Sequence, residues 1–209
     1  MIRPPGFSGA AFGEAAEGDL RVDAGRRRLV ADELGIPPEW AFVSQVHGTA
    51  VIHASSPGRL GEADAVYTTR QALPVAIATA DCVPVILEGS GFAAVVHAGW
   101  RGAASGVLQA TVEALAESGL AAERAAIGPG IGPCCYEVGD EVAARFAGHV
   151  SHTTWGATSI DIGGYLESVL DPLPVWRSER CTFTDEDLNS YRRDRTELRQ
   201  VAVAWLSPV

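Results

Sequence analysis

Hydrophobic positions recur with helical spacing in several parts of the chain. In residues 20–35, this pattern is bounded by Asp23, a typical N-cap, and by Gly35, a typical helix end. In residues 103–119, one predicted helix face carries Val107, Thr111 and Leu115, and a neighbouring face carries Leu108 and Val112. Further helices are predicted around Val138, Val142 and Phe146, and over residues 159–170 with Asp161 as the cap.

Short runs rich in β-branched residues alternate with these helices and predict strands. Pro84 predicts an irregular or edge position for its strand. Several steps between strands are too short for a crossover helix, which favours an α+β fold over a doubly wound one. We therefore expect one domain over residues 1–209, with mixed β-sheet layers flanked by helices. The predicted strands cover residues 40–46, 49–53, 63–69, 73–80, 83–87, 91–97 and 199–206.

Composition narrows the class of protein. The chain has 209 residues, 47% of them hydrophobic and 20% charged, as in a soluble globular protein. Its formal net charge is −10, and all its basic residues are arginines. This acidity argues against nucleic acid or an anionic membrane as a partner, but local arginines could still hold a small anion. The start lacks a secretion signal, no apolar stretch is long enough to span a membrane, and the cysteines show no disulfide framework, so a reduced cytoplasmic protein is expected.

Three candidate metal ligands stand where strand patterns break, at His47, Cys82 and His97. Two imidazoles and one thiolate suit zinc, and three protein ligands leave a fourth position open, as in catalytic zinc sites. Spacing alone leaves other interpretations open. The cysteine could be a buried core thiol and the histidines could bond nearby backbone, or Cys82 could be a nucleophile with a histidine as its base. Asp81 could donate a proton, support a ligand or serve as a turn residue.

Other candidates surround these three. Arg101 lies just before the helix predicted to begin near Ala103, where an anion such as phosphate is favoured; a surface ion pair is the alternative. The glycine-rich segment 128–133 lacks both standard phosphate-loop patterns and is interpreted as a stiff turn beside a pocket. Cys134 and Cys135 are expected to be pocket-wall or core thiols. Arginines 26–28 form a solvated helix face, from which one side chain could point inward.

Several long motifs resemble the multicopper polyphenol oxidase (laccase-domain) proteins of the YfiH type. The resemblance runs in order from about residue 18 to the C-terminus. Members are also called purine nucleoside phosphorylases, and one branch is called peptidoglycan editing factors. The family fold is a compact layered arrangement of helices and strands, grouped with cysteine hydrolases. The motifs that carry the resemblance are SQVHGTAV, EADAVYTT, ATADCVPVIL, AVVHAGWRGAASGVL and IGPGIGPCCYEVGDEV.

The resemblance implies a site and an activity. It places the family's metal-binding residues on His47, Cys82 and His97, with zinc as the metal and copper as the alternative. It implies phosphorolysis of adenosine and inosine, use of methylthioadenosine, and deamination of adenosine, so that a purine nucleoside and phosphate are the expected partners. The catalytic set is expected to be His47, Cys82, His97, Asp81 and Arg101, and the substrate-binding set Arg26, Gln45, Arg101 and Cys134.

The chain departs from the family pattern at the pocket. The N-terminal FSxRxGG…SLN segment is replaced by FSGAAFGEAAEGD, the SYRRDGxTGR segment reads SYRRDRTELR, and Gly25 replaces the asparagine that precedes the arginine matched by Arg26. The HxE…PCxxC signature of zinc deaminases is absent, so any deamination would use another layout. Alternative functions are a copper polyphenol oxidase, an amidase that edits peptidoglycan precursors, and a non-catalytic binding module stabilised by zinc.

Overall fold

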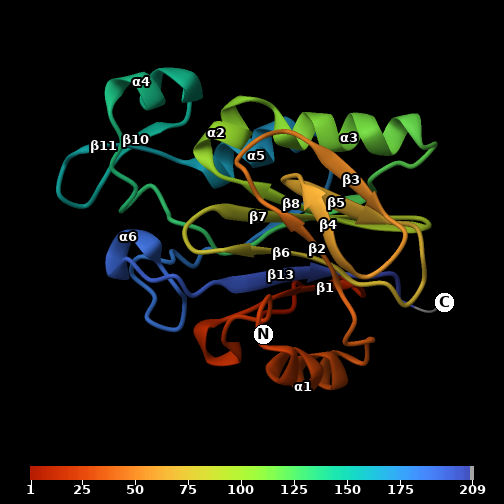
Figure 1. The fold of residues 1–209 in the computed structure, drawn as a ribbon. Helices are drawn as coiled ribbons and strands as arrows, with labels where there is room; N and C mark the ends of the chain where they lie inside the picture. The colour runs from red at the N-terminus through yellow and green to blue at the C-terminus, as the bar shows by residue number, and fades with distance from the viewer. Residues whose placement is uncertain (208–209) are drawn as a thin grey trace.

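The computed structural model describes residues 1–207 and shows two stacked sheets between layers of helices (Figure 1). The six-stranded sheet has the order β12-β9-β7-β8-β5-β3 and the five-stranded sheet the order β1-β13-β6-β2-β4. The first comprises β3 (Val51–Ala54), β5 (Ala65–Thr68), β7 (Val83–Gly89), β8 (Phe92–Ala98), β9 (Arg124–Ile127) and β12 (Val175–Arg177). The second comprises β1 (Ala10–Phe12), β2 (Ala41–Ser44), β4 (Gly58–Glu62), β6 (Val75–Thr79) and β13 (Gln200–Ala204).

Helices cover the outer faces of both sheets. In Figure 1, α2, α3 and α5 lie over the six-stranded sheet and α1 lies under the five-stranded one. A small hairpin of β10 (Val150–His152) and β11 (Thr158–Ile160) stands at one end beside α4. The helices are α1 (Ala24–Leu34), α2 (Trp100–Ala104), α3 (Val107–Glu117), α4 (Asp140–Ala143), α5 (Ile162–Leu170) and α6 (Tyr191–Asp194), with single 3-10 turns at Ala15–Glu17 and Ala144–Phe146.

Three hydrophobic clusters fill the spaces between the layers. One joins the six-stranded sheet to α3 and α5 and contains Leu108, Leu115 and Leu166. A second lies between the two sheets, and a third packs α1 against the five-stranded sheet through Val30 and Trp40. The central strands β6, β7, β8 and β13 are covered on both faces, which explains their nearly continuous hydrophobic sequence.

The α+β expectation is confirmed. Parallel pairs (β3 with β5, β9 with β12, and β2 with both β4 and β6) occur in the same sheets as antiparallel ones. The predicted caps also hold: Asp23 accepts a hydrogen bond from the backbone N–H of Arg26, and Asp161 accepts one from Gly164. Gly35 ends α1 in the left-handed conformation. Within residues 1–207, no helix combines the length and apolarity that crossing a bilayer requires.

Four local expectations need correction. Pro84 is not at a sheet edge, because β7 lies between β8 and β9; the proline is tolerated because the paired register with β9 begins only at Val85. The helix predicted over residues 103–119 begins earlier, at Trp100, and is broken before α3 at Gly106, whose φ is +89°.

The hydrophobic face of the segment after residue 138 is also shorter than predicted. It forms one α-helical turn and one 3-10 turn rather than a longer helix. Phe146 is nevertheless fully buried, whereas Val112 on α3 is 40% exposed, so the face proposed for Leu108 and Val112 is only partly a core face.

Candidate functional site

His47, Cys82 and His97 come together at the ends of three strand segments. His47 follows β2, Cys82 precedes β7, and His97 is near the end of β8. Their ligand atoms all lie within 4.8 Å of one another, and 3.8 Å separates the Cys82 Sγ from the His47 Nε2. His47 is exposed, Cys82 is half-buried and His97 is buried. The three side chains therefore form a compact group that is reachable from one side.

A buried carboxylate organises this group. Asp64, just before β5, is fully buried and accepts hydrogen bonds from the backbone N–H groups of Val46, His47 and Gly48 at 2.6–3.2 Å. It also bonds the Nδ1 of His97 at 2.7 Å. That bond fixes the imidazole so that Nε2 is the nitrogen left to face the other ligands. Asp64 thus positions both histidines at once.

The loop backbone is held in an uncommon conformation. His47 has a φ of +60° and Asp81 a φ of +88°, both in the left-handed region that favours glycine. The hydrogen bonds that the backbone N–H groups of His47 and Gly48 donate to Asp64 hold the loop at His47 in this conformation. Gly99 allows the ligands to meet, because a Cβ there would lie 2.7 Å from the His47 ring and 3.1 Å from the Cys82 Sγ.

The electrostatics of the metal-free group favour ionised cysteine. Burial opposes ionisation of Cys82, but hydrogen bonds from His47 and His97 outweigh it and lower the pKa of the thiol to about 6. Burial likewise opposes protonation of His97, but Asp64 and Cys82 raise its pKa to about 9. At neutral pH a thiolate therefore lies beside an imidazolium.

This donor set fits a single metal ion. One thiolate and two imidazoles are common ligands of zinc and also suit copper. Asp64 fixes the tautomer of His97, and the exposed side of His47 leaves room for another ligand. The residues present therefore fit the metal that the resemblance implies.

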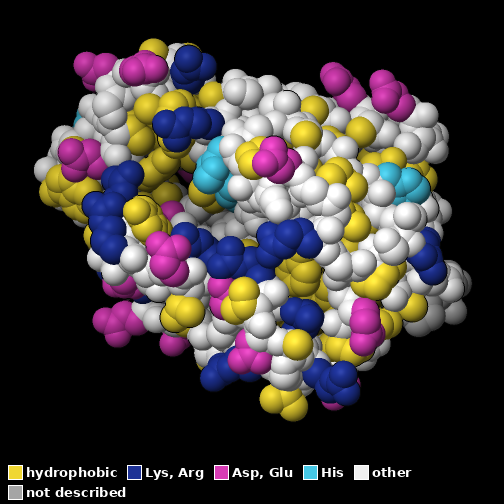
Figure 2. All heavy atoms as spheres, viewed as in Figure 1, with side chains coloured by type: hydrophobic (Ala, Val, Ile, Leu, Met, Phe, Trp, Pro, Cys, Tyr) yellow, Lys and Arg dark blue, Asp and Glu magenta, His cyan; other side chains and the backbone are white. Residues whose placement is uncertain are grey.

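The group opens into a pocket of about 620 Å³. Figure 2 shows a hollow with arginine side chains around it and a histidine at its edge. The pocket is walled by residues from well-separated segments: Arg21, Phe42, Val43, Ser44, Gln45, His47, Arg59, Ala78, Thr79, Ala80, Asp81, Cys82, His97, Trp100, Arg101, Tyr136, Tyr191, Arg192 and Arg199. Such a volume is typical of small-molecule sites.

Of the five arginines in the pocket wall, Arg21 pairs with Asp19, and the other four have no carboxylate partner among residues 1–207. Arg59 donates to the Ser44 hydroxyl, and Arg192 and Arg199 donate to backbone carbonyls. Arg101 lies over the Trp100 ring at 4.4 Å. In the described part of the chain, these four arginines form no ion pair with an acidic side chain. The pocket is thus locally basic in an acidic protein.

The structure places three of the other predicted site residues in this pocket. Arg101 is inside the five-residue α2, not before the helix as predicted, because α2 begins at Trp100. Asp81 lines the pocket, but its carboxylate accepts bonds from the Thr182 and Ser190 hydroxyls and from a backbone N–H. Gln45 uses its amide to bond both backbone groups of Ala78 on β6, at 2.7 and 2.9 Å.

Arg26 and Cys134 are not brought to this pocket. The Arg26 guanidinium donates to the Ala16 carbonyl at 3.1 Å and pairs with Asp23, since its helix position faces away. Of arginines 26–28, the side chain that points inward is Arg27, which donates to the carbonyls of residues 20 and 38. Cys134 lines a second pocket with the glycine-rich segment 128–133.

Sequence reasoning missed several residues of the site. Asp64 had one available signal: a carboxylate flanked by alanines within an apolar strand pattern. Tyr136, Arg59 and Arg192 reach the pocket from distant segments and carry no such local signal. Arg21, rather than Arg26, contributes the pocket arginine from the N-terminal part of the chain.

Several known proteins are similar to this chain over most of its length. A purine nucleoside phosphorylase of Streptomyces griseus is 38% identical over 96% of this chain and 90% of its own length. A purine nucleoside phosphorylase of Corynebacterium glutamicum is 36% identical over 93% of this chain and 86% of its own length. The crystal structure of YlmD from Geobacillus stearothermophilus superposes with a TM-score of 0.85 at 28% identity, covering 99% of this chain and 98% of that one.

A second solved structure and a family model also match most of this chain. The structure of the hypothetical protein YfiH of Bacillus licheniformis superposes with a TM-score of 0.79 at 26% identity, covering 88% of this chain and 80% of that one. The model described as multi-copper polyphenol oxidoreductase laccase matches residues 6–207. The resemblance seen in the motifs is confirmed, and the chain belongs to the multi-copper polyphenol oxidoreductase laccase family of YfiH-type proteins.

Proposed function

We propose that this chain is a zinc-dependent purine nucleoside phosphorylase. Adenosine and inosine are its substrates, methylthioadenosine is a further one, and deamination of adenosine is a second activity of the same site. The observation that carries the proposal is the convergence of His47, Cys82 and His97 on a pocket whose wall includes four arginines without carboxylate partners among the described residues. The names of the relatives support an enzyme of this type.

The arginines supply the charge that phosphate requires. Phosphate carries negative charge, and guanidinium groups bind it through paired N–H donors. Arg101 lies in the same pocket as the three ligands. We assign it to phosphate, with Arg59, Arg192 and Arg199 contributing to the positive potential. Phosphate is a small anion that a few local arginines can hold, in keeping with a net charge of −10, which argues against nucleic acid as a partner.

The remaining side chains position the substrate and protons. Asp64 holds the His97 Nδ1, and Asp81 ties β7 to the segment around Ser190. Burial raises the pKa of Tyr136 to about 12, so its phenol keeps its proton and can donate a hydrogen bond into the pocket. A zinc ion bound by the three ligands would supply Lewis-acid polarisation of a substrate group.

The substrate assay separates the candidate activities. The purified protein is incubated with adenosine, with inosine and with a muramyl-amino-acid precursor, each with and without phosphate, and the products are separated by chromatography. Phosphorolysis predicts free base and ribose 1-phosphate only when phosphate is present. Equal release of base without phosphate would reject the phosphorylase, and ammonia with inosine from adenosine would demonstrate deamination.

Two histidine variants form a matched pair for this assay. His97→Ala should abolish turnover and release zinc, because two remaining ligands form a poor site. His53→Ala should keep both, since His53 is exposed and only stacks on Tyr67 and bonds Thr69. If the two variants behaved alike, the group around His97 would not be the working site.

Metal content and phosphate dependence test the remaining assignments. Elemental analysis should find one zinc per chain after purification without added metal. Stoichiometric copper with oxidation of phenols would instead favour the oxidase that the family's description names. Arg101→Ala should raise the phosphate concentration needed for half-maximal rate and leave zinc content unchanged, and an unaltered phosphate dependence would remove Arg101 from this role. Bound zinc without turnover of any substrate would favour a binding module.

A further inference from the structure

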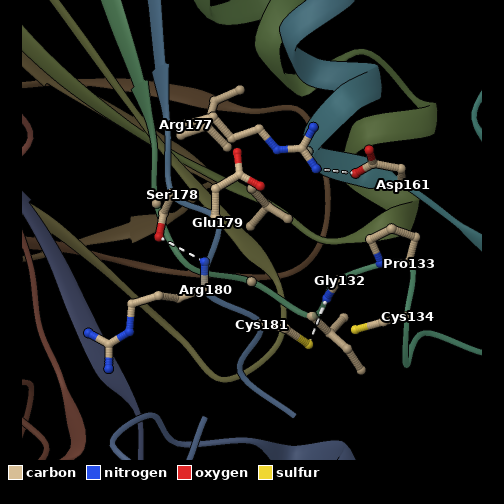
Figure 3. A pocket seen from close by; sticks show the side chains of 15 residues that line it. Gly132, Pro133, Cys134, Asp161, Arg177, Ser178, Glu179, Arg180 and Cys181 are labelled. Atoms are coloured by element: carbon tan, nitrogen blue, oxygen red, sulfur yellow. Dashed lines mark hydrogen bonds and ion pairs between the residues drawn. The ribbon is translucent and has the colours of Figure 1, made fainter. Parts of the chain in front are cut away.

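A second group of sulfur side chains lies outside the candidate metal centre. Cys134, Cys135 and Cys181 have their Sγ atoms within 4.8 Å of one another. Cys134 and Cys181 line a second pocket of about 330 Å³. Its walls include neither the three candidate metal ligands nor any arginine of the first pocket. Figure 3 shows both sulfur atoms close together beside Gly132. The function proposed above uses none of these thiols.

The surroundings of Cys181 stabilise a thiolate. The backbone N–H of Gly132 donates to its Sγ at 3.1 Å. Burial favours the neutral thiol, but the backbone N–H groups of Gly132, Phe183 and Thr184 outweigh this effect and lower the pKa of Cys181. Since the thiolate is the nucleophilic form of cysteine, Cys181 is the reactive member of the group.

Cys134 is the better partner for Cys181. Burial raises the pKa of both thiols, but Cys135 is 2% exposed whereas Cys134 is half-buried and lines the pocket. The Cys134 and Cys135 sulfurs are 3.0 Å apart. A disulfide between neighbours is nevertheless disfavoured, because consecutive Cα atoms are about 3.8 Å apart across a trans peptide and disulfides need about 4.4–6.8 Å.

We propose that Cys181 and Cys134 form a peroxide-sensitive dithiol, a site of reversible oxidation separate from the metal centre. The Cys181 thiolate attacks a hydroperoxide oxygen, the S–O bond forms, the O–O bond breaks, and the leaving alkoxide or hydroxide takes a proton from solvent. The Cys134 sulfur then attacks the Cys181 sulfenic acid and loses its proton. The S–S bond forms and water leaves. The two thiols lose two electrons in total and the hydroperoxide gains them.

The test uses the full chain with its metal bound. The protein is treated with an equimolar amount of hydrogen peroxide, free thiols are alkylated, and peptides are mapped by mass spectrometry. Linked peptides containing Cys134 and Cys181 are expected, with thiol reactivity restored by dithiothreitol. In wild type, a dimedone trap added with the peroxide should label Cys181, a readout that needs no variant.

Three serine variants assign the roles. Cys181→Ser should leave the Cys134 thiol free after peroxide, and Cys135→Ser should leave the linked pair intact. Cys134→Ser should stop Cys181 at the sulfenic acid with one equivalent of peroxide, and a second equivalent should take it to the sulfinic acid. Linkage of Cys134 to Cys135, or dimedone labelling of Cys134 alone, would overturn the assignment. A second bound metal equivalent that Cys181→Ser removes would show a thiolate metal site instead and would also overturn it.

Discussion

The Asp64 carboxylate accepts four hydrogen bonds while fully buried, from the N–H groups of one loop and from His97 on β8. One side chain therefore joins two of the three candidate ligands. Burial opposes its ionisation, but the bond from His97 and the backbone donors outweigh this and lower its pKa. Loss of the charge should disturb both histidines together.

Asp64→Asn should weaken zinc binding by about 10- to 100-fold, the usual cost of losing a partner that orients a metal ligand. The amide keeps the size of the side chain but points N–H donors at other N–H groups. Competition with a chromophoric chelator measures the affinity. Asp161→Asn is the matched control, because that carboxylate caps α5 and pairs with Arg177 away from the metal group. Unchanged affinity in the first variant would show that Asp64 serves stability alone.

In the metal-stripped protein, alkylation of Cys82 should become half-maximal near pH 6, whereas an ordinary thiol would require about pH 9. The lowered pKa means that the thiolate and its stabilising interaction are present above about pH 6 and are lost as the pH falls through it. The partner charge on His97 is lost as the pH rises through about 9. Mass mapping of the Cys82 peptide gives the rate, and His47→Ala should shift the profile to higher pH.

At the scale of elements, the junction between β8 and α2 decides whether the ligands can meet. Gly99 is the N-cap of α2, with extended φ and ψ that any residue adopts, so its requirement is one of space. A Cβ there meets the His47 ring at 2.7 Å, which is closer than real Cβ contacts. At the junction of β8 and α2, the backbone of Gly99 therefore lies directly against His47 and Cys82, where a side chain would not fit.

Gly99→Ala should lower zinc affinity by about tenfold or more because the His47 ring must shift from its place. Gly139→Ala is a matched control: Gly139 is also a helix N-cap with nearly the same backbone angles, and an added Cβ there meets nothing within 4 Å. Zinc titration of both variants, with circular dichroism to verify folding, makes the comparison. Equal affinities would show that the ring can yield without cost.

At the scale of the whole molecule, three hydrophobic clusters join the two sheets to each other and to the helices that cover them. β13, near the C-terminus, lies between β1 and β6, so the two ends of the chain join in one sheet. Hydrophobic clusters lie on both faces of each sheet, and each of the three clusters has a tryptophan in it or packed against it. Trp100 packs against the cluster under α3 and α5, Trp176 against the cluster between the sheets, and Trp40 and Trp205 belong to the cluster under α1. For the described residues 1–207, this arrangement favours a single cooperative unit.

Unfolding in urea should therefore show one midpoint by far-UV circular dichroism and by tryptophan fluorescence. Parallel measurements on zinc-loaded and metal-stripped protein separate the stabilisation contributed by the ion, which shifts the midpoint by mass action. Two midpoints that persist in the metal-stripped protein would divide the chain into separate domains and contradict the single-domain prediction.

The sequence by itself determined much of the local structure and which chemically reactive side chains are available. Caps such as Asp23 and Asp161 and the apolar runs of the strands act over a few residues, so the pattern alone predicts them. The same holds for the short steps that imply mixed sheets. The pattern also marks His47, Cys82 and His97 as residues that stand where strands break, but their assignment as metal ligands came from the family resemblance and stays a prediction. The hydrophobic pattern was not sufficient at Gly106, whose left-handed conformation breaks the predicted helix.

Only the tertiary structure decided which side chains meet. Asp64 reaches the histidines, Arg59 and Arg192 reach the pocket, and Cys181 reaches Cys134 because two sheets stack and long loops fold over their ends. Arg26 is excluded from the pocket by the direction in which its helix face points. Such meetings depend on how distant segments pack, and neither residue spacing nor hydrophobic periodicity carries that information.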